Sequence, residues 1–157
     1  MHTLTPLPKL NSSPRSFGRP LSLLVVDDDE VDREMMVRGL TKSGIDHHIR
    51  TARDGVEAME ILHGQNGNPR LHAPFLVVLD LNMPRMDGHE FLETLRLTPM
   101  LAETPVFIVT TSDHEDDIRA AYGQGVAGYI VKDRAGSNYS RLIEMLQAYW
   151  RIVEFPS

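Results

Sequence analysis

The distribution of apolar and polar residues divides most of the chain into two alternating kinds of segment. Short apolar runs rich in β-branched residues predict buried strands, and each is followed by a longer segment whose apolar residues recur at helical spacing. The predicted strands span residues 21–26, 47–52, 75–80, 105–111 and 127–132. The predicted helices span residues 30–44, 55–64, 86–97, 113–125 and 137–153.

This order of elements indicates an α/β fold, a parallel sheet with helices on both faces. In open sheets of this kind, ligands bind beyond the carboxyl ends of the strands. The residues that end the strands are therefore the candidates for chemistry. They are three acids, a hydroxyl and an ammonium: Asp27, Asp28, Asp80, Thr110 and Lys132. Core packing alone gives no reason to place such side chains there.

The first strand ends directly against four acids, Asp27 to Glu30. Two carboxylates about 4 Å apart repel by roughly 4 kcal/mol at an effective dielectric constant near 20, so these acids either splay into water or surround a cation. Asp29 and Glu30 are better explained as capping and dipole residues of the next helix. Mg²⁺ accepts one or two carboxylates and completes its shell with water and a phosphate oxygen, which predicts magnesium at Asp27, Asp28 and Asp80.

The same strand ends carry groups that suit a phosphoryl group. Lys132 offers a compact positive charge to one phosphate oxygen, and Thr110 offers a hydroxyl to another. A carboxylate with such neighbours can act as a nucleophile and form an aspartyl phosphate. Asp80 is the best candidate, because it stands alone at the end of the central strand.

Composition narrows the function further. A length of 157 residues suits one domain, and the absence of cysteine excludes disulfides and thiol chemistry. The formal charge of −6 argues against binding of nucleic acid or acidic membranes. No membrane-spanning run or signal peptide is recognisable, so a cytoplasmic protein is expected. Four of the ten prolines lie in residues 1–20, which predicts an extended tail. The domain is expected over residues 21–150 and an arm over 151–157.

Four stretches together resemble the receiver domain of two-component response regulators: "LLVVDDD", "VLDLNMPRMDGHEFL", "TPVFIVTTS" and "GYIVK". The resemblance covers residues 21–150 and implies a flavodoxin-like, doubly wound sheet of five strands in the order 2-1-3-4-5. It implies a phosphoacceptor that takes a phosphoryl group from a sensor histidine kinase. Such a protein is no enzyme with a separate substrate, because it catalyses only its own phosphorylation and dephosphorylation.

The resemblance assigns roles to the metal and acceptor residues. Asp80 would be the phosphoacceptor. Asp28 and Asp80 would bind Mg²⁺ directly together with the backbone carbonyl of Asn82, and Asp27 would hold it through water. The Asn82 side chain, two residues after the acceptor, is either a group that tunes attack of water on the phosphoryl group or a solvent-exposed amide.

The resemblance also assigns the groups that would respond to phosphorylation. Thr110 and Lys132 would contact the phosphoryl group, and Tyr129 matches an aromatic switch residue that turns inward when Thr110 moves. Ordinary strand packing explains Tyr129 equally well. Ser112 has the same two interpretations as the Asn82 side chain. Pro84 and Gly88 would shape the loop that closes the site.

Partners follow from the same comparison. The domain fills nearly all of the chain, so the output is expected to be a changed surface on the fourth helix, fifth strand and fifth helix, or onward transfer to a histidine phosphotransfer protein. "FLVVLDLNMPRMDGHEFL" and "TTSDHEDDI" resemble regulators paired with bacterial phytochrome kinases. The last helix carries an apolar stripe that either covers the core or forms a homodimer with the arm. The stripe consists of Leu142, Leu146, Tyr149, Trp150 and Val153.

The sequence departs from the receiver pattern directly after Lys132. Receivers usually have proline after the strand-5 lysine, whereas this chain has Asp133. A trans peptide bond is expected before Asp133, and this acid could compete for Lys132.

Two rival functions would need residues that this chain lacks at the corresponding positions. A phosphohydrolase of the aspartyl-phosphate type would need a second acid where Asn82 stands, and a cap domain. A flavin-binding domain would need a glycine- or hydroxyl-rich loop where "DDDE" stands.

Overall fold

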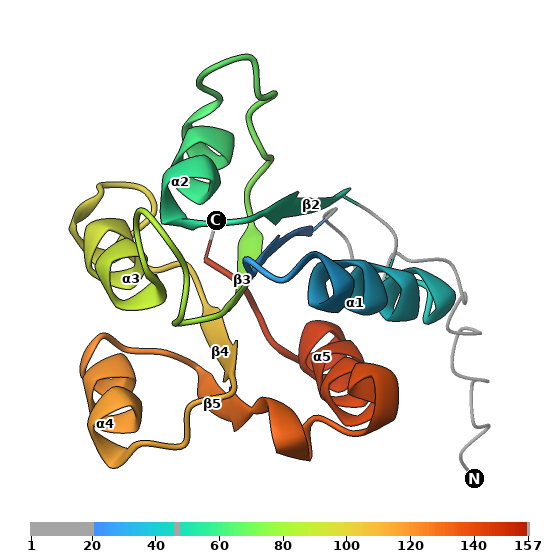
Figure 1. Cartoon of the computed structure of the whole chain (residues 1–157). Coiled ribbons are helices and arrows are strands. Elements are labelled where there is room, and N and C mark those ends of the chain that lie inside the picture. Colours follow the sequence, from blue (N-terminus) through green and yellow to red (C-terminus); the bar gives the residue numbers. More distant parts are fainter. Residues whose placement is uncertain (1–20, 46–47, 157) are drawn as a thin grey trace, which may run out of the picture.

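The five strands form one parallel sheet in the order β2-β1-β3-β4-β5, as predicted (Figure 1). The computed structural model describes residues 21–45 and 48–156, so the predicted tail 1–20 lies outside the described residues. The strands are β1 (Ser22–Val26), β2 (His48–Ala52), β3 (Phe75–Leu79), β4 (Val106–Thr110) and β5 (Gly128–Val131). The helices are α1 (Glu30–Lys42), α2 (Gly55–His63), α3 (Gly88–Leu97), α4 (Glu115–Gly123) and α5 (Ser140–Ile152).

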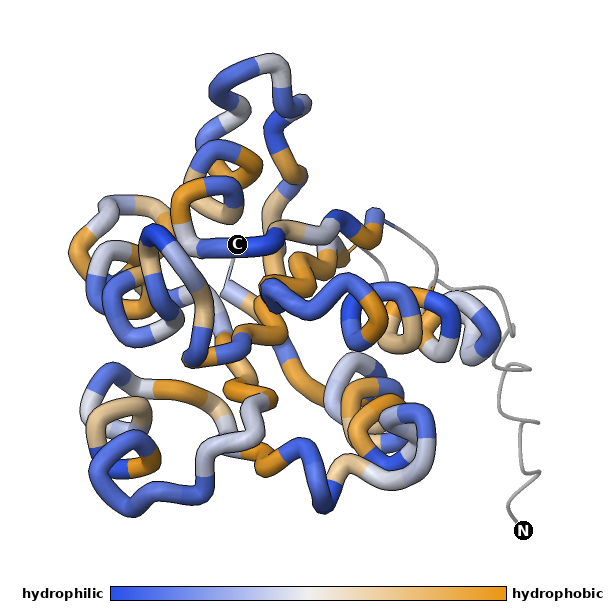
Figure 2. Tube along the Cα trace, viewed as in Figure 1, coloured by the Kyte–Doolittle hydropathy of each residue, from blue (hydrophilic) through white to orange (hydrophobic). Residues whose placement is uncertain are grey.

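The helices cover both faces of the sheet, which confirms the doubly wound class. Successive residues of a strand point to opposite faces, so Leu23 of β1 packs toward α1 and α5 while Leu24 packs toward α2, α3 and α4. The central strands β1, β3 and β4 are buried along their whole length, and Figure 2 shows apolar residues gathered at the sheet. Within the described residues, no helix has both the length and the apolar character needed to cross a bilayer.

Local polar residues decide where the helices begin. Asp29, Asp54 and Asp87 cap α1, α2 and α3, and each side chain accepts a hydrogen bond from the backbone N–H three residues later. The expected cap at Asp29 is thereby confirmed. α5 begins at Ser140, three residues later than predicted, because Ser137–Tyr139 form a tight 3₁₀ turn.

The apolar stripe of the last helix mainly covers the core of its own subunit. Leu142, Leu146 and Trp150 are buried, and the Tyr149 ring packs edge-on against Phe107 at a centroid distance of 4.9 Å. Phe155, beyond the helix, packs against the other side of the same aromatic cluster at 5.8 Å from Tyr149. The arm therefore folds back on its own chain in this structure.

Gly88 is held by close backbone packing, and we expect Gly88→Ala to destabilise the fold. A Cβ there would lie 2.3 Å from the Asp80 carbonyl oxygen and 2.6 Å from the Leu81 Cα. Such overpacking costs about 1–3 kcal/mol, to be measured as the free energy of unfolding in urea. Gly123→Ala is the control, because a Cβ at the end of α4 meets nothing within 4 Å. Equal effects of the two substitutions would contradict this account of Gly88.

Candidate phosphoryl and metal site

Three acids meet at the carboxyl edge of the two central strands. Asp27 follows β1 and Asp80 follows β3, and these strands pair in parallel with Val26 opposite Leu79. The Asp80 backbone N–H donates to the Val26 carbonyl at 2.8 Å, which holds the two strand ends level. One carboxylate oxygen from each of Asp27, Asp28 and Asp80 lies within 4.8 Å of the other two. This donor set consists of hard oxygens and fits a divalent cation.

The site concentrates negative charge where water is scarce. Asp27 is 1% exposed and Asp80 is 6% exposed, while Asp28 faces solvent. Burial raises the pKa of Asp27 to about 6, and repulsion from Asp80 adds to this rise, although hydrogen bonds from Lys132 and the Asp29 backbone oppose it. Bringing these carboxylates together in ionised form therefore requires positive charge beside them.

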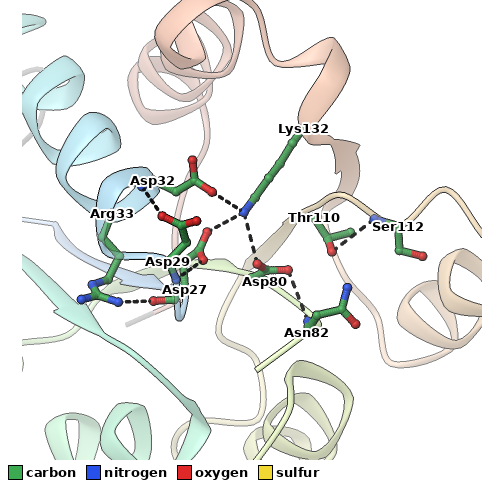
Figure 3. Close-up of polar contacts among 9 residues, drawn as sticks. All are labelled: Asp27, Asp29, Asp32, Arg33, Asp80, Asn82, Thr110, Ser112 and Lys132. Carbon is green, nitrogen blue, oxygen red and sulfur yellow. Dashed lines mark hydrogen bonds and ion pairs between the residues drawn. The ribbon is translucent and has the colours of Figure 1, made fainter. Parts of the chain in front are cut away.

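Lys132 supplies one positive charge from the end of β5. Its Nζ lies 2.8 Å from Asp27 Oδ2, 2.8 Å from Asp32 Oδ2 and 3.2 Å from Asp80 Oδ2 (Figure 3). Burial of the ammonium works to lower the pKa of Lys132, but hydrogen bonds and attraction from the carboxylates outweigh it and raise this pKa well above its ordinary value. The side chain is therefore a fixed cation.

The structure corrects one expectation about Lys132. Asp133 is exposed, and the carboxylates that bind Lys132 are those of Asp27, Asp32 and Asp80. The acid that competes for the ammonium is thus Asp32, in the first turn of α1. Among the described residues the one cis peptide bond is Ala73–Pro74, so the bond before Asp133 is trans, as predicted.

The remaining predicted residues surround Asp80. The Asn82 backbone N–H donates to Asp80 Oδ1 at 3.3 Å, and the Asn82 side chain is exposed. Thr110 is fully buried at the end of β4, and Figure 3 shows its hydroxyl on the Asp80 side of the site. The Ser112 backbone N–H lies 3.5 Å from Thr110 Oγ1. Asn82, Thr110 and Ser112 thus lie at the same edge of the sheet as Asp80.

A hydrogen-bond network joins the loop after β4 to two helices. Ser112 Oγ donates to Asp117 of α4 at 2.5 Å, and the other Asp117 oxygen lies 2.9 Å from His89 Nε2 of α3. The hydrogen bonds from Ser112 and His89 lower the pKa of Asp117. The Tyr129 hydroxyl donates to the Ser112 carbonyl at 2.9 Å. Tyr129 is therefore bonded to the loop that follows Thr110.

A second ion pair fixes the loop that follows Asp80. Arg85 Nε and Nη2 donate to the two oxygens of Asp54 at 2.7 and 3.0 Å, and the Gly55 N–H donates to the Met86 carbonyl at 3.0 Å. Arg85 adopts a left-handed backbone with φ 64°. The loop is thereby bound to the start of α2.

Arg85→Ala is expected to lower the free energy of unfolding, because it leaves the buried carboxylate of Asp54 without its bidentate partner. Burial alone would raise the pKa of Asp54, but hydrogen bonds from Arg85 and the Glu57 backbone lower it below 3.8. This stabilisation is therefore present above pH 3.8 and is lost as the pH falls below that value.

Urea unfolding at neutral pH and below pH 3.8 measures both effects. The wild type should lose more stability on acidification than Arg85→Ala does. Arg119→Ala is the control, because Arg119 pairs with exposed Glu115 on the same helix. Identical acid sensitivity in wild type and Arg85→Ala would contradict the role of this pair.

The fold and the strand-end site define the class of protein. The response regulator receiver domain family matches residues 23–147, and the chain belongs to this family. It is a receiver-domain response regulator of two-component signalling. Receiver domains accept phosphate from histidine kinases and bind a divalent metal, which agrees with the donor set formed by Asp27, Asp28 and Asp80.

Particular relatives resemble almost the whole described chain. Response regulator Rcp1 of Synechocystis sp. is 34% identical over 131 residues, which cover 83% of this chain and 89% of Rcp1. The probable methanogenesis regulatory protein FilR2 of Methanothrix harundinacea is 33% identical over 131 residues, which cover 83% of this chain and 84% of FilR2. Among solved structures, the Mn²⁺-bound form of Rcp1 has a TM-score of 0.75 at 33% identity, covering 88% of this chain and 100% of that one.

Proposed function

We propose that Asp80 is the phosphoacceptor and that Asp27, Asp28, Asp80 and the Asn82 backbone carbonyl hold Mg²⁺. The supporting observation is the convergence of three carboxylates within 4.8 Å at the strand ends, with Lys132 Nζ 3.2 Å from Asp80. Mg²⁺, when bound, would neutralise charge on the carboxylates and on the phosphoryl oxygens. The domain would span residues 21–150, between a tail and an arm.

The protein groups would act by being in place before phosphate arrives. An Asp80 oxygen would attack the phosphorus of the donor, and the bond from phosphorus to the donor's leaving atom would break. Lys132 would donate to one phosphoryl oxygen, and Thr110 would donate its hydroxyl to another. Movement of Thr110 would then be transmitted to Tyr129 through Ser112, because the Tyr129 hydroxyl donates a hydrogen bond to the Ser112 carbonyl.

A phosphohydrolase acting on separate substrates is the less favoured alternative. That chemistry needs a second acid two residues after the nucleophile, and exposed Asn82 stands there. An amide cannot donate a proton to a leaving group as a carboxylic acid does. The chain would therefore catalyse only its own phosphorylation and dephosphorylation.

The phosphodonor would be a sensor histidine kinase in the cytoplasm, and a bacteriophytochrome is the type we propose. The similar Rcp1 and the phosphorylated cyanobacterial phytochrome response regulator RcpA support this type of partner. RcpA has a TM-score of 0.74 at 33% identity, covering 87% of this chain and 98% of that one. Onward transfer to a histidine phosphotransfer protein would be a second output besides a changed surface.

A homodimer through α5 and the arm is also part of this proposal, although most of the apolar stripe is buried within one subunit. Ile152, at the end of α5, is 81% exposed. Ile152→Lys is expected to shift a concentration-dependent dimer to monomer in analytical ultracentrifugation, because a charge would replace an apolar contact. Leu97→Lys, 77% exposed on α3, is the control. A wild type that stays monomeric at every concentration would exclude the dimer.

Acetyl phosphate tests the proposed chemistry without a kinase. The intact protein should gain the mass of one phosphoryl group when Mg²⁺ is present and should gain none after the metal is chelated. The modification should survive acid and be lost in base, as an acyl phosphate is. Equal labelling with and without Mg²⁺ would contradict the metal site.

A further inference from the structure

Asp32 binds Lys132 as closely as any acid in the site. It lies in the first turn of α1, and its Oδ2 is 2.8 Å from Lys132 Nζ. The corresponding distance to Asp80 is 3.2 Å. Asp32 lies outside the group of three acids that could hold a metal ion. The ammonium thus lies nearer to a carboxylate of α1 than to the phosphoacceptor.

The hydrogen-bonding capacity of Lys132 is fully used. An ammonium has three N–H donors, and these go to Asp27, Asp32 and Asp80. In Figure 3, Asp32 lies on one side of the ammonium, and Asp80 and Thr110 lie on the other. A phosphoryl group on Asp80 that extended toward Thr110 would therefore draw the ammonium away from Asp32.

Asp32 is also the partner that can be released with least cost. Asp27 is 1% exposed, so its carboxylate has almost no access to water, whereas the Asp32 side chain is 25% exposed. Loss of a charged partner costs most where the remaining group is buried. A phosphoryl group on Asp80 would therefore compete with Asp32, rather than with Asp27, for the ammonium.

We propose that Asp32 is a positioning residue that restrains Lys132 in the unphosphorylated protein. The inference rests on the proposed role of Asp80 as phosphoacceptor.

Removal of the Asp32 charge should speed phosphorylation. At saturating Mg²⁺, Asp32→Asn should raise the rate constant of phosphorylation by acetyl phosphate about 5-fold, because the ammonium loses a competing anion.

A matched variant separates this effect from a general effect of charge. Glu30→Gln removes an exposed negative charge from the same helix end. Urea unfolding and Mg²⁺ titration of both variants report whether the fold and the metal site persist. A purely structural role of Asp32 would slow phosphorylation in Asp32→Asn.

The outcomes distinguish the two levels of the proposal. Phosphorylation that is faster in Asp32→Asn than in Glu30→Gln would support the restraint. A labelled wild type with Asp32→Asn no faster than Glu30→Gln would overturn the restraint and leave the acceptor assignment standing. A wild type that takes up no phosphate would overturn both.

Discussion

Asp80→Asn is expected to abolish phosphoryl uptake completely. An amide oxygen is a poor nucleophile toward phosphorus, and no acyl phosphate can form on it. The fold should persist, because Asn keeps the size of Asp80 and removes one negative charge from a repelling group. Intact-mass spectrometry after incubation with acetyl phosphate and Mg²⁺ measures the result.

Asp113→Asn is the control for this substitution. Asp113 is an exposed acid in the loop after β4, outside the group that could hold a metal. Its removal changes the net charge as Asp80→Asn does and should leave phosphoryl uptake intact. Labelling of Asp80→Asn at the wild-type rate would place the acceptor elsewhere.

Lys132→Met is expected to change phosphorylation and metal affinity in opposite directions. The rate constant of phosphorylation should fall by about 100-fold, the usual effect of removing one preorganised donor to a developing charge. Affinity for Mg²⁺ should rise, because an ammonium 2.8–3.2 Å from Asp27 and Asp80 opposes the binding of a second cation. Titration calorimetry and acetyl phosphate kinetics measure the two quantities.

The same variant should unfold more easily without metal. Removing Lys132 leaves buried Asp27 and Asp80 unpaired, which costs about 3 kcal/mol. Mg²⁺ should therefore raise the melting temperature of Lys132→Met more than that of the wild type. Lys42→Met, at the exposed end of α1, is the control. Unchanged metal affinity in Lys132→Met would contradict the arrangement of charges described above.

The sheet and the strand-end acids were predictable because both depend on position along the chain. Apolar runs place β1 and β3 in the core, and a parallel sheet brings their carboxyl ends to one edge. The residues directly after these runs, Asp27 and Asp80, must then lie near each other. The same reasoning placed Thr110 and Lys132 at that edge, where the structure has them.

Residues on helices and loops were harder to assign. Whether Asp32 faces Lys132 depends on how α1 is rotated against the sheet, and the position of Asp32 in the chain does not specify that rotation. His89 and Asp117 meet only because α3 and α4 lie side by side. A helix start with two acids three residues apart, Asp29 and Asp32, looks the same whether the second acid faces solvent or the site.

The apolar stripe of α5 illustrates a different limit. Periodicity counts apolar positions but does not reveal which surfaces of the same chain are available to cover them. Tyr149 packs between Phe107 of β4 and Phe155 of the arm. Much of the apolar surface of α5 that suggested a second subunit is therefore covered by residues of the same chain. The proposed homodimer now depends on Ile152, which is exposed.

Borohydride trapping tests the central claim most directly. Reduction of an aspartyl phosphate by borohydride converts that residue to homoserine, which peptide mass spectrometry locates in the chain. After treatment with acetyl phosphate and Mg²⁺, the wild type should carry homoserine at position 80 alone, and chelation of Mg²⁺ before treatment should prevent it. Homoserine at another acid, or at position 80 regardless of metal, would contradict a cation-dependent phosphoacceptor at Asp80.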